Sequence, residues 1–275
     1  MSRLDKLALM AETLVPRLAA TVLTLREAPN GYEILMLRRN VRSEFMGGVF
    51  VFPGGAVDDD DVAVPVYGLT DEMASRRLGL DHGGLAFYVA GLRELFEEAG
   101  LLIACNDQGH EIRFTALEDL ERLGSYRRSL NAGEIAFAEI MAREGVRLDL
   151  RGVGYLAHWI TPQGLSRRYD TRFFVVLAPE GQPATHDSNE TVDQRWMRPV
   201  DALVAQRNGD FDMVVPTIRN LESISHLSSA SEALDFARAL GLVTAVEPRI
   251  IERKGGPVIV TPGEEGYGDA PPSEE

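Results

Sequence analysis

The chain has 275 residues, of which 45% are hydrophobic and 25% are charged, as expected for one large globular domain with or without an addition. Its formal net charge of −14 disfavours nucleic-acid polymers and membrane surfaces as partners, because their phosphates repel an acidic protein. One cysteine excludes an intramolecular disulfide, no uncharged run is long enough to cross a bilayer, and a cytoplasmic location is expected.

Three strands are expected in the first part of the chain. Residues 17–27 and 32–40 both read as strands, and an Asn-Gly pair between them is a strong hairpin signal. Residues 48–55 form a third strand that ends on Pro-Gly-Gly. Four aspartates follow, and the stretch from there to about residue 84 has no clear pattern, although residues 70–80 are compatible with a short helix.

Apolar residues recur at three- and four-residue steps from residue 85 to residue 99, which predicts a helix with Gly100 as its C-cap. Away from this apolar stripe, Glu94, Glu97 and Glu98 fall within an arc of about 100°. Like charges at this spacing repel by a few tenths of a kcal/mol per pair. A solvated acidic face is the ordinary interpretation. The functional alternative is a site for a hard cation such as Mg²⁺, which prefers carboxylate oxygens.

The rest of the chain mixes helices and strands irregularly. A helical region is expected over 116–145 with a break near 129–133. Further strands are expected at 152–160, 171–179, 193–199 and 257–261, and further helices at 200–209, 216–227 and 231–241. This irregular order favours the α+β class, with a mixed sheet flanked by helices.

Residues 93–101, RELFEEAGL, resemble the second half of the sequence box of the Nudix hydrolases at every fixed position. The first half appears earlier as FPGGAVDDDD, with Gly55 as the box glycine and Asp61 in place of a glutamate. The family has seven residues between that acid and the arginine, whereas here 31 intervene, which indicates an insertion of 24 (31 minus 7). The resemblance implies a Nudix-type α/β/α sandwich with a mixed sheet, a helical insertion and C-terminal helices.

This resemblance leads to an expected domain organisation. The Nudix domain would cover residues 15–203, followed by a helical C-terminal extension over 204–262 and a disordered tail over 263–275. Within the domain, the expected segments are the two box halves at 54–61 and 93–101, the insertion at about 62–84, and the helical segment at about 116–145.

The resemblance also implies roles for the residues of the box. Glu97 and Glu98 would bind Mg²⁺ or Mn²⁺, and Glu94 would be a further ligand or the base that takes a proton from the attacking water. The backbone carbonyl of Gly54 would be another metal ligand, and Arg93 would orient the glutamates. A metal-bound water has a lowered pKa, and a nearby carboxylate can remove its proton, so this acid set suits hydrolysis of a diphosphate bond.

Several arginines are candidates for binding the substrate. Arg167 and Arg168 lie in a loop between two expected strands, where a guanidinium could bind a phosphate, although an ion pair with Asp170 or a plain surface loop is the alternative. Arg38 and Arg42 are further candidates near the diphosphate. Because successive residues of a strand point to opposite faces, at most one of Arg38 and Arg39 would point inward.

An additional acid from a late loop is common in these enzymes, and Glu190 is the candidate here, with His186 and Asp187 as alternatives. This acid would serve as a ligand or as the base.

The segments GGVFVFPGG and WITPQGLSRRYDTRFF, together with the interrupted box, resemble the coenzyme A diphosphatase-like Nudix proteins of the peroxisomal type. This resemblance implies metal-dependent hydrolysis of coenzyme A or acyl-coenzyme A to 3′,5′-ADP and (acyl)phosphopantetheine. Nucleotide sugars, dinucleotides or nucleoside triphosphates are alternative substrates. A non-catalytic nucleotide-sensing module is a third possibility, which the complete acid set disfavours. The C-terminal helices would either cover the active site or form the surface of a homodimer.

Overall fold

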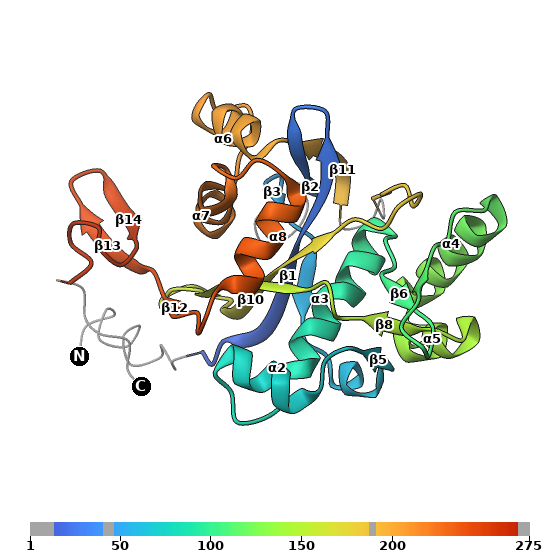
Figure 1. Cartoon of the computed structure of the whole chain (residues 1–275). Helices are drawn as coiled ribbons and strands as arrows, with labels where there is room; N and C mark the ends of the chain where they lie inside the picture. The colour runs from blue at the N-terminus through green and yellow to red at the C-terminus, as the bar shows by residue number, and fades with distance from the viewer. Residues whose placement is uncertain (1–13, 41–46, 187–190, 269–275) are drawn as a thin grey trace.

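A computed structural model describes residues 14–40, 47–186 and 191–268. An eight-stranded mixed sheet forms its centre, in the order β11-β2-β1-β10-β9-β12, with β3 paired to β2 and β4 paired to β1 (Figure 1). The β1–β10 and β9–β12 pairs are parallel and the other pairs are antiparallel. The strands are β1 (Arg17–Ala28), β2 (Gly31–Arg39), β3 (Phe50–Val51), β4 (Gly54–Ala56), β9 (Gly154–Ile160), β10 (Tyr169–Leu177), β11 (Thr191–Met197) and β12 (Ala245–Val246).

Helices cover both faces of this sheet, which confirms the predicted sandwich. Helix α3 packs against one face, while α7 and α8 lie on the opposite side (Figure 1). The helices are α2 (Asp71–Leu78), α3 (Gly84–Ala99), α4 (Leu117–Asn131), α5 (Phe137–Glu144), α6 (Pro199–Arg207), α7 (Val215–Ile224) and α8 (Ala230–Ala239). A 3₁₀ helix, η1 (Asp59–Ala63), follows β4.

The alternation of side chains along β1 explains why the sheet is covered on both faces. Ala20 and Val22 belong to the core beneath α3, whereas Leu23 and Leu25 belong to the core beneath α7 and α8. Successive residues of a strand point to opposite faces, so an apolar strand of this kind needs a helical layer on each side.

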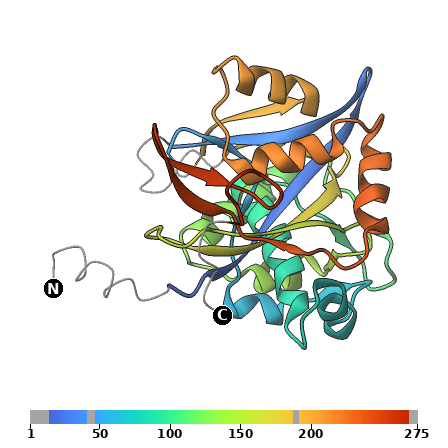
Figure 2. The same ribbon diagram turned by 90° about the vertical axis from the view of Figure 1, so that its left-hand side faces the viewer.

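Two smaller sheets complete the fold. One contains β5 (Val66–Tyr67), β8 (Arg147–Asp149), β6 (Ala104–Cys105) and β7 (Glu111–Ile112), and the other is the hairpin of β13 (Arg249–Arg253) and β14 (Gly256–Val260). Figure 2 shows the β13–β14 hairpin standing in front of the central sheet. The sequence patterns predicted β14 but not β13, nor the two- and three-residue strands of the first of these sheets, because such short strands have almost no periodicity.

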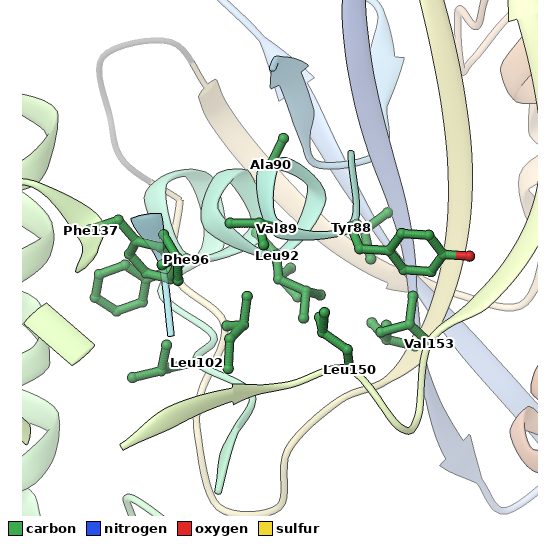
Figure 3. Packing of buried hydrophobic residues seen from close by; sticks show 14 of the residues in the cluster. Tyr88, Val89, Ala90, Leu92, Phe96, Leu102, Phe137, Leu150 and Val153 are labelled. Carbon is green, nitrogen blue, oxygen red and sulfur yellow. The ribbon is translucent and has the colours of Figure 1, made fainter. Parts of the chain in front are cut away.

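Helix α3 is buried on nearly every side. Ala90 projects from the side of the helix opposite to Leu92, while Phe96 lies beside Phe137 of α5 (Figure 3), with the two ring centroids 5.8 Å apart. A Cβ at Gly91 would lie 2.8 Å from the side chain of Val22, so this glycine permits close contact between α3 and β1. The predicted helix and its Gly100 C-cap are confirmed.

The insertion helps to build the start of α3. Gly83 is the N-cap of α3 and has no side chain to satisfy the first backbone N–H groups. Asp71 of α2 accepts hydrogen bonds from the backbone N–H groups of Gly83 and Leu85, both at 2.9 Å. These contacts lower the pKa of the Asp71 carboxyl below its usual value. Ser75 Oγ accepts a further bond from the N–H of Gly84 at 2.8 Å. The inserted helix therefore provides the cap that α3 lacks.

The C-terminal part differs from the expected helical extension. Helix α8 packs on β9 and β10, and β12 joins the central sheet, so the core continues across the boundary placed at residue 203. The segment also contains three strands besides its helices. In the expected disordered tail, residues 263–268 form turns, and the Tyr267 hydroxyl donates a hydrogen bond to the carbonyl of Glu247 at 3.0 Å.

Two of the expected elements are interrupted at other positions in the structure. The expected strand over 48–55 is divided into β3 and β4, because Pro53 between them has no N–H to donate to a ladder. The break in the region 116–145 lies at 132–136, between α4 and α5. Among the residues that the structure describes, no helix has both the length and the apolarity needed to cross a membrane.

Candidate active site

The acidic edge of α3 faces β4. A Cβ placed on Gly55 would lie 2.4 Å from Glu94 Oε1, and the backbone N–H of Gly54 donates to Glu98 Oε2 at 3.1 Å. Gly55 therefore leaves room for the Glu94 carboxylate beside the strand, while Gly54 contacts Glu98 through its backbone. Glu98 is only 6% exposed, so the solvated acidic face is the wrong interpretation for this residue.

Arg93 holds the acidic residues together. Its Nε donates to Asp61 Oδ1 at 2.8 Å, and its Nη1 donates to both Glu94 Oε1 and Glu97 Oε1 at 2.9 Å. Its Nη2 donates to the carbonyl of Ala56 at 2.8 Å. Burial of Arg93 opposes its charge, but the hydrogen bond to Asp61 and the charge of Glu94 outweigh this, and the pKa of the guanidinium is raised. Arg93 is a permanent cation that fixes three carboxylates in position, those of Asp61, Glu94 and Glu97.

Asp61 binds Arg93 and faces away from solvent. The side chain is 1% exposed, and its Oδ2 also accepts the backbone N–H of Asp58 at 2.8 Å. Asp61 is shorter than the glutamate of the family, and it reaches Arg93 because η1 folds back toward α3. The two halves of the box are thus joined by an ion pair across the insertion.

Glu97 lies among several like charges. Burial raises its pKa, Arg93 opposes this rise, and the carboxylates of Asp58 and Asp61 contribute to it. The backbone carbonyl of Glu97 accepts bonds from Arg127 Nε at 2.7 Å and from Asn131 Nδ2 at 3.3 Å. Two side chains of α4 therefore support the C-terminal turn of α3, where orphan carbonyls need partners.

This arrangement fits a bound cation, although it is not preformed as a metal site. Within the described ranges, no three His, Cys, Asp or Glu side chains converge in a geometry ready to hold a metal ion. Glu94 and Glu97 converge on the guanidinium of Arg93 instead. The donor set of carboxylates beside a strand backbone is nevertheless the kind that hard divalent cations prefer. Burial is the main reason that the pKa of Glu97 is raised, and a bound cation would offset the smaller contribution from repulsion by Asp58 and Asp61.

A cavity of about 730 Å³ opens beside the acidic edge. Its charged lining comes from α3, β1, β2 and the segments that follow β4 and β9, and consists of Glu94, Glu97, Glu98, Arg93, Asp58, Arg17, Arg39 and Arg167. The apolar lining includes Trp159, Ile160, Pro162, Leu165, Phe173, Val215, Pro248 and Ile259. The cavity therefore has a charged part and an apolar part.

Only some of the arginines predicted to bind substrate line the cavity. Arg39 lines the cavity and Arg38 does not. Nε of Arg38 donates instead to the carbonyl of Gly48 at 3.2 Å. The structure thus places Arg39 rather than Arg38 at the cavity, and a role in substrate binding stays a prediction for both residues. Arg42 and Glu190, with the alternative Asp187, lie outside the described residues.

Arg167 and Arg168 also differ in whether their side chains reach the cavity. Arg167 lines the cavity, as expected for a residue that binds substrate. The Arg168 side chain is only 7% exposed, and its Nη2 pairs with Glu247 Oε1 at 2.5 Å rather than with Asp170. This contact favours a structural role for Arg168 over phosphate binding. Sequence reasoning missed Arg17, which lines the cavity from the start of β1 and pairs with Asp58. Its side of the strand becomes evident only when the strand register is known.

The family model described as the NUDT19 Nudix domain matches residues 82–224. This chain belongs to the NUDT19 Nudix family. An acyl-coenzyme A diphosphatase NUDT19 of Xenopus laevis is 26% identical over 277 residues, which covers 87% of this chain and 72% of that protein. The human protein of the same name is 26% identical over 272 residues, which covers 86% of this chain and 72% of that protein.

A solved structure supports the fold assignment of this NUDT19 family member. A crystal structure of a NUDIX hydrolase from Alicyclobacillus acidocaldarius matches with a TM-score of 0.64 and 26% identity, covering 81% of this chain and 97% of that chain. The predicted family and the predicted enzyme class, a hydrolase of diphosphate bonds, are confirmed. Nudix hydrolases generally use divalent metal ions.

Proposed function

We propose that this chain hydrolyses the diphosphate bond of coenzyme A or acyl-coenzyme A and releases 3′,5′-ADP and (acyl)phosphopantetheine. The observation that carries this proposal is the acidic edge of α3, which lines a large cavity in a chain whose relatives are named acyl-coenzyme A diphosphatases. The cavity is large enough for a drug-sized ligand, and it combines charged and apolar lining. A nucleotide joined to an apolar arm has the same combination.

In this proposal Glu97, Glu98 and the carbonyl of Gly54 hold Mg²⁺ or Mn²⁺, and Glu94 serves as the base rather than as a further ligand. Bound there, the metal would polarise a phosphate oxygen and lower the pKa of a water. The glutamates lie on one edge of a helix that is buried in the core, so their backbone is fixed relative to β4. Arg93 restrains Glu94 and Glu97 in the same region.

Glu94 is the described residue best placed to take the proton of the attacking water. Its carboxylate lies against Gly55, at the side of the cavity where β4 and α3 meet. Arg39 and Arg167 line the same cavity, and their guanidinium groups would bind the phosphates of the substrate. Charge that develops on the leaving phosphate would be stabilised by the same groups.

The test is hydrolysis by the purified chain with Mg²⁺ or Mn²⁺. Coenzyme A, acyl-coenzyme A, NADH, ADP-ribose and diadenosine polyphosphates would be supplied separately, and the products identified by mass spectrometry. We expect 3′,5′-ADP from the coenzyme A substrates, loss of turnover with EDTA, and recovery when the metal is restored. Turnover of only the other substrates would reject the coenzyme A assignment while keeping the hydrolase. Binding without turnover of any substrate would point to a nucleotide-sensing module.

A further inference from the structure

The floor of the cavity is one continuous row of residues across the central sheet. Ala56 of β4 pairs with Ala19 of β1, Ala19 with Thr171 of β10, and Thr171 with Trp159 of β9. All four residues line the cavity. Neighbouring strands are about 4.8 Å apart, so the three steps from Ala56 to Trp159 span about 14 Å.

The two ends of this row have different chemistry. At the first end, the Ala56 carbonyl accepts a hydrogen bond from Arg93, which places the acidic edge of α3 there. At the other end, Trp159 pairs with Val246 of β12, and the chain then leads directly into Pro248 and the β13–β14 hairpin. Pro248 and Ile259 of this segment both line the cavity.

The hairpin has its own anchors on the body of the domain. Arg168, which follows β9, pairs with Glu247 at 2.5 Å, immediately before Pro248. Arg219 of α7 pairs with Glu264 at 2.5 Å, after the hairpin. The hairpin is therefore held at both of its ends and presents Ile259 to the cavity, although this side chain is still 46% exposed. An apolar side chain of this kind can be covered by an apolar ligand.

We propose that the far end of the row, formed by Trp159, Pro248 and Ile259, is the subsite for the acyl chain of an acyl-coenzyme A thioester. The inference rests on the proposed function and adds a preference for acylated over free coenzyme A. A substrate cut at the acidic end would extend about 14 Å or more along the row before it reaches this apolar wall, by which we mean Trp159, Pro248 and Ile259. The hairpin lies outside residues 82–224, which match the family model, so this part of the specificity belongs to a segment that the family model does not cover.

The experiment compares Ile259→Asp with wild-type protein on free coenzyme A and on a long-chain acyl-coenzyme A. A charge at the wall penalises an apolar chain and leaves the charged end unchanged, so kcat/KM for the acyl substrate should fall by at least about tenfold, while kcat/KM for coenzyme A stays within about twofold. Val204→Asp is the matched control, because Val204 on α6 is also 46% exposed and does not line the cavity. The control should leave both substrates within about twofold.

A second variant tests the wall without changing its lining. Glu247→Gln removes the charge that holds Arg168 and should also lower the preference for the acyl substrate. An equal loss on both substrates in Ile259→Asp would show that the far end holds a part common to both, the nucleotide or the pantetheine arm. Unchanged kinetics would show that it holds no part of the substrate. Either result overturns the inference. If wild-type protein cleaves neither substrate, the proposed function fails, and the inference fails with it.

Discussion

The acidic end of the cavity is held together differently from the apolar end. At the acidic end, Arg93 donates to Asp61, Glu94 and Glu97 within 2.9 Å, and the helix that carries it is buried in the core. At the apolar end, Pro248 and Ile259 come from a two-stranded hairpin tied to the domain by ion pairs such as Arg168 to Glu247. An isolated two-stranded hairpin is marginally stable in water, so these ion pairs help to hold the hairpin in place.

This difference separates chemistry from recognition. Groups that act on the reacting atoms must be held within a fraction of an ångström, and a buried helix edge provides that precision. A wall that contacts an apolar chain needs only the right character and approximate size, which a hairpin can provide. Substitutions at the acidic end should therefore change rate or stability strongly, whereas substitutions at the hairpin should change the choice of substrate.

The largest effect is expected at the acidic end, from Glu98→Gln. Glutamine keeps an oxygen that can accept the Gly54 N–H, but it removes a negative charge proposed to bind the metal. Loss of several kcal/mol of electrostatic stabilisation corresponds to a fall in kcat of about 10³-fold or more. The melting temperature should stay close to that of wild type. Near-full activity of this variant would reject the metal assignment.

The control for this variant is Glu118→Gln on the surface of α4. Glu118 is an exposed residue in the first turn of that helix and does not line the cavity. Its substitution should leave kcat unchanged. A comparable loss of activity in both variants would mean that overall charge, rather than the position of Glu98, determines the rate.

A large loss of stability is expected from Arg93→Gln. The variant leaves Asp61 buried without the guanidinium that binds it in two places. Breaking a buried ion pair by removing one partner typically costs about 3–5 kcal/mol of unfolding free energy, measurable by urea denaturation. Glu94 and Glu97 also lose their common donor, so activity should fall as well.

The double variant Arg93→Gln/Asp61→Asn distinguishes the two roles of Arg93. Removing the buried charge of Asp61 should recover part of the stability without recovering activity, because the glutamates remain unrestrained. Recovery of activity in the double variant would contradict the idea that Arg93 positions Glu94 and Glu97. Unchanged stability in the single variant would contradict the buried ion pair.

Local patterns were sufficient for the parts of the site that lie close together in the sequence. The periodicity of residues 85–99 and the glycine after it predicted α3 with its glutamates on one edge. The Gly-Gly pair at the end of the third predicted strand was also identified from a local signal. The structure places Glu94 beside Gly55 and Glu98 beside Gly54, so the two halves of the box lie together. The roles of the glutamates as metal ligands or base stay a prediction.

Partners that are distant in the sequence could not be predicted. Asp61 and Arg93 are separated by the whole insertion, and their ion pair depends on how η1 folds back. Arg168 and Arg167 are adjacent and identical in type, and only the position of Glu247, 79 residues away from Arg168, decides which one is structural. The pairing of β12 with β9, which joins the C-terminal segment to the central sheet, was missed for a similar reason, because such strand pairing is non-local.

The smallest effect is expected from Asp71→Ala, at the start of α3. The variant removes the acceptor for two backbone N–H groups, and loss of a cap of this kind costs about 1 kcal/mol of unfolding free energy. The Asp71 pKa is lowered in the folded state, so its contribution is full above the unfolded value of about 3.9 and is lost as the pH falls through the folded value. Denaturation curves at pH 7 should differ by this amount, and the difference should shrink at pH 3.

Two controls make this small effect interpretable. Glu72→Ala removes a neighbouring exposed acid whose contact is an ion pair with Arg76, worth only about 0.3–0.5 kcal/mol at this helical spacing. Glu247→Gln removes a contact of the hairpin and should leave the stability of the core nearly unchanged, because the hairpin lies outside both cores formed with the helices. If Glu247→Gln lowered the free energy of unfolding more than Asp71→Ala does, the hairpin would be as much a part of the folded core as α3. The proposed division between a fixed acidic end and a tethered apolar end would then be wrong.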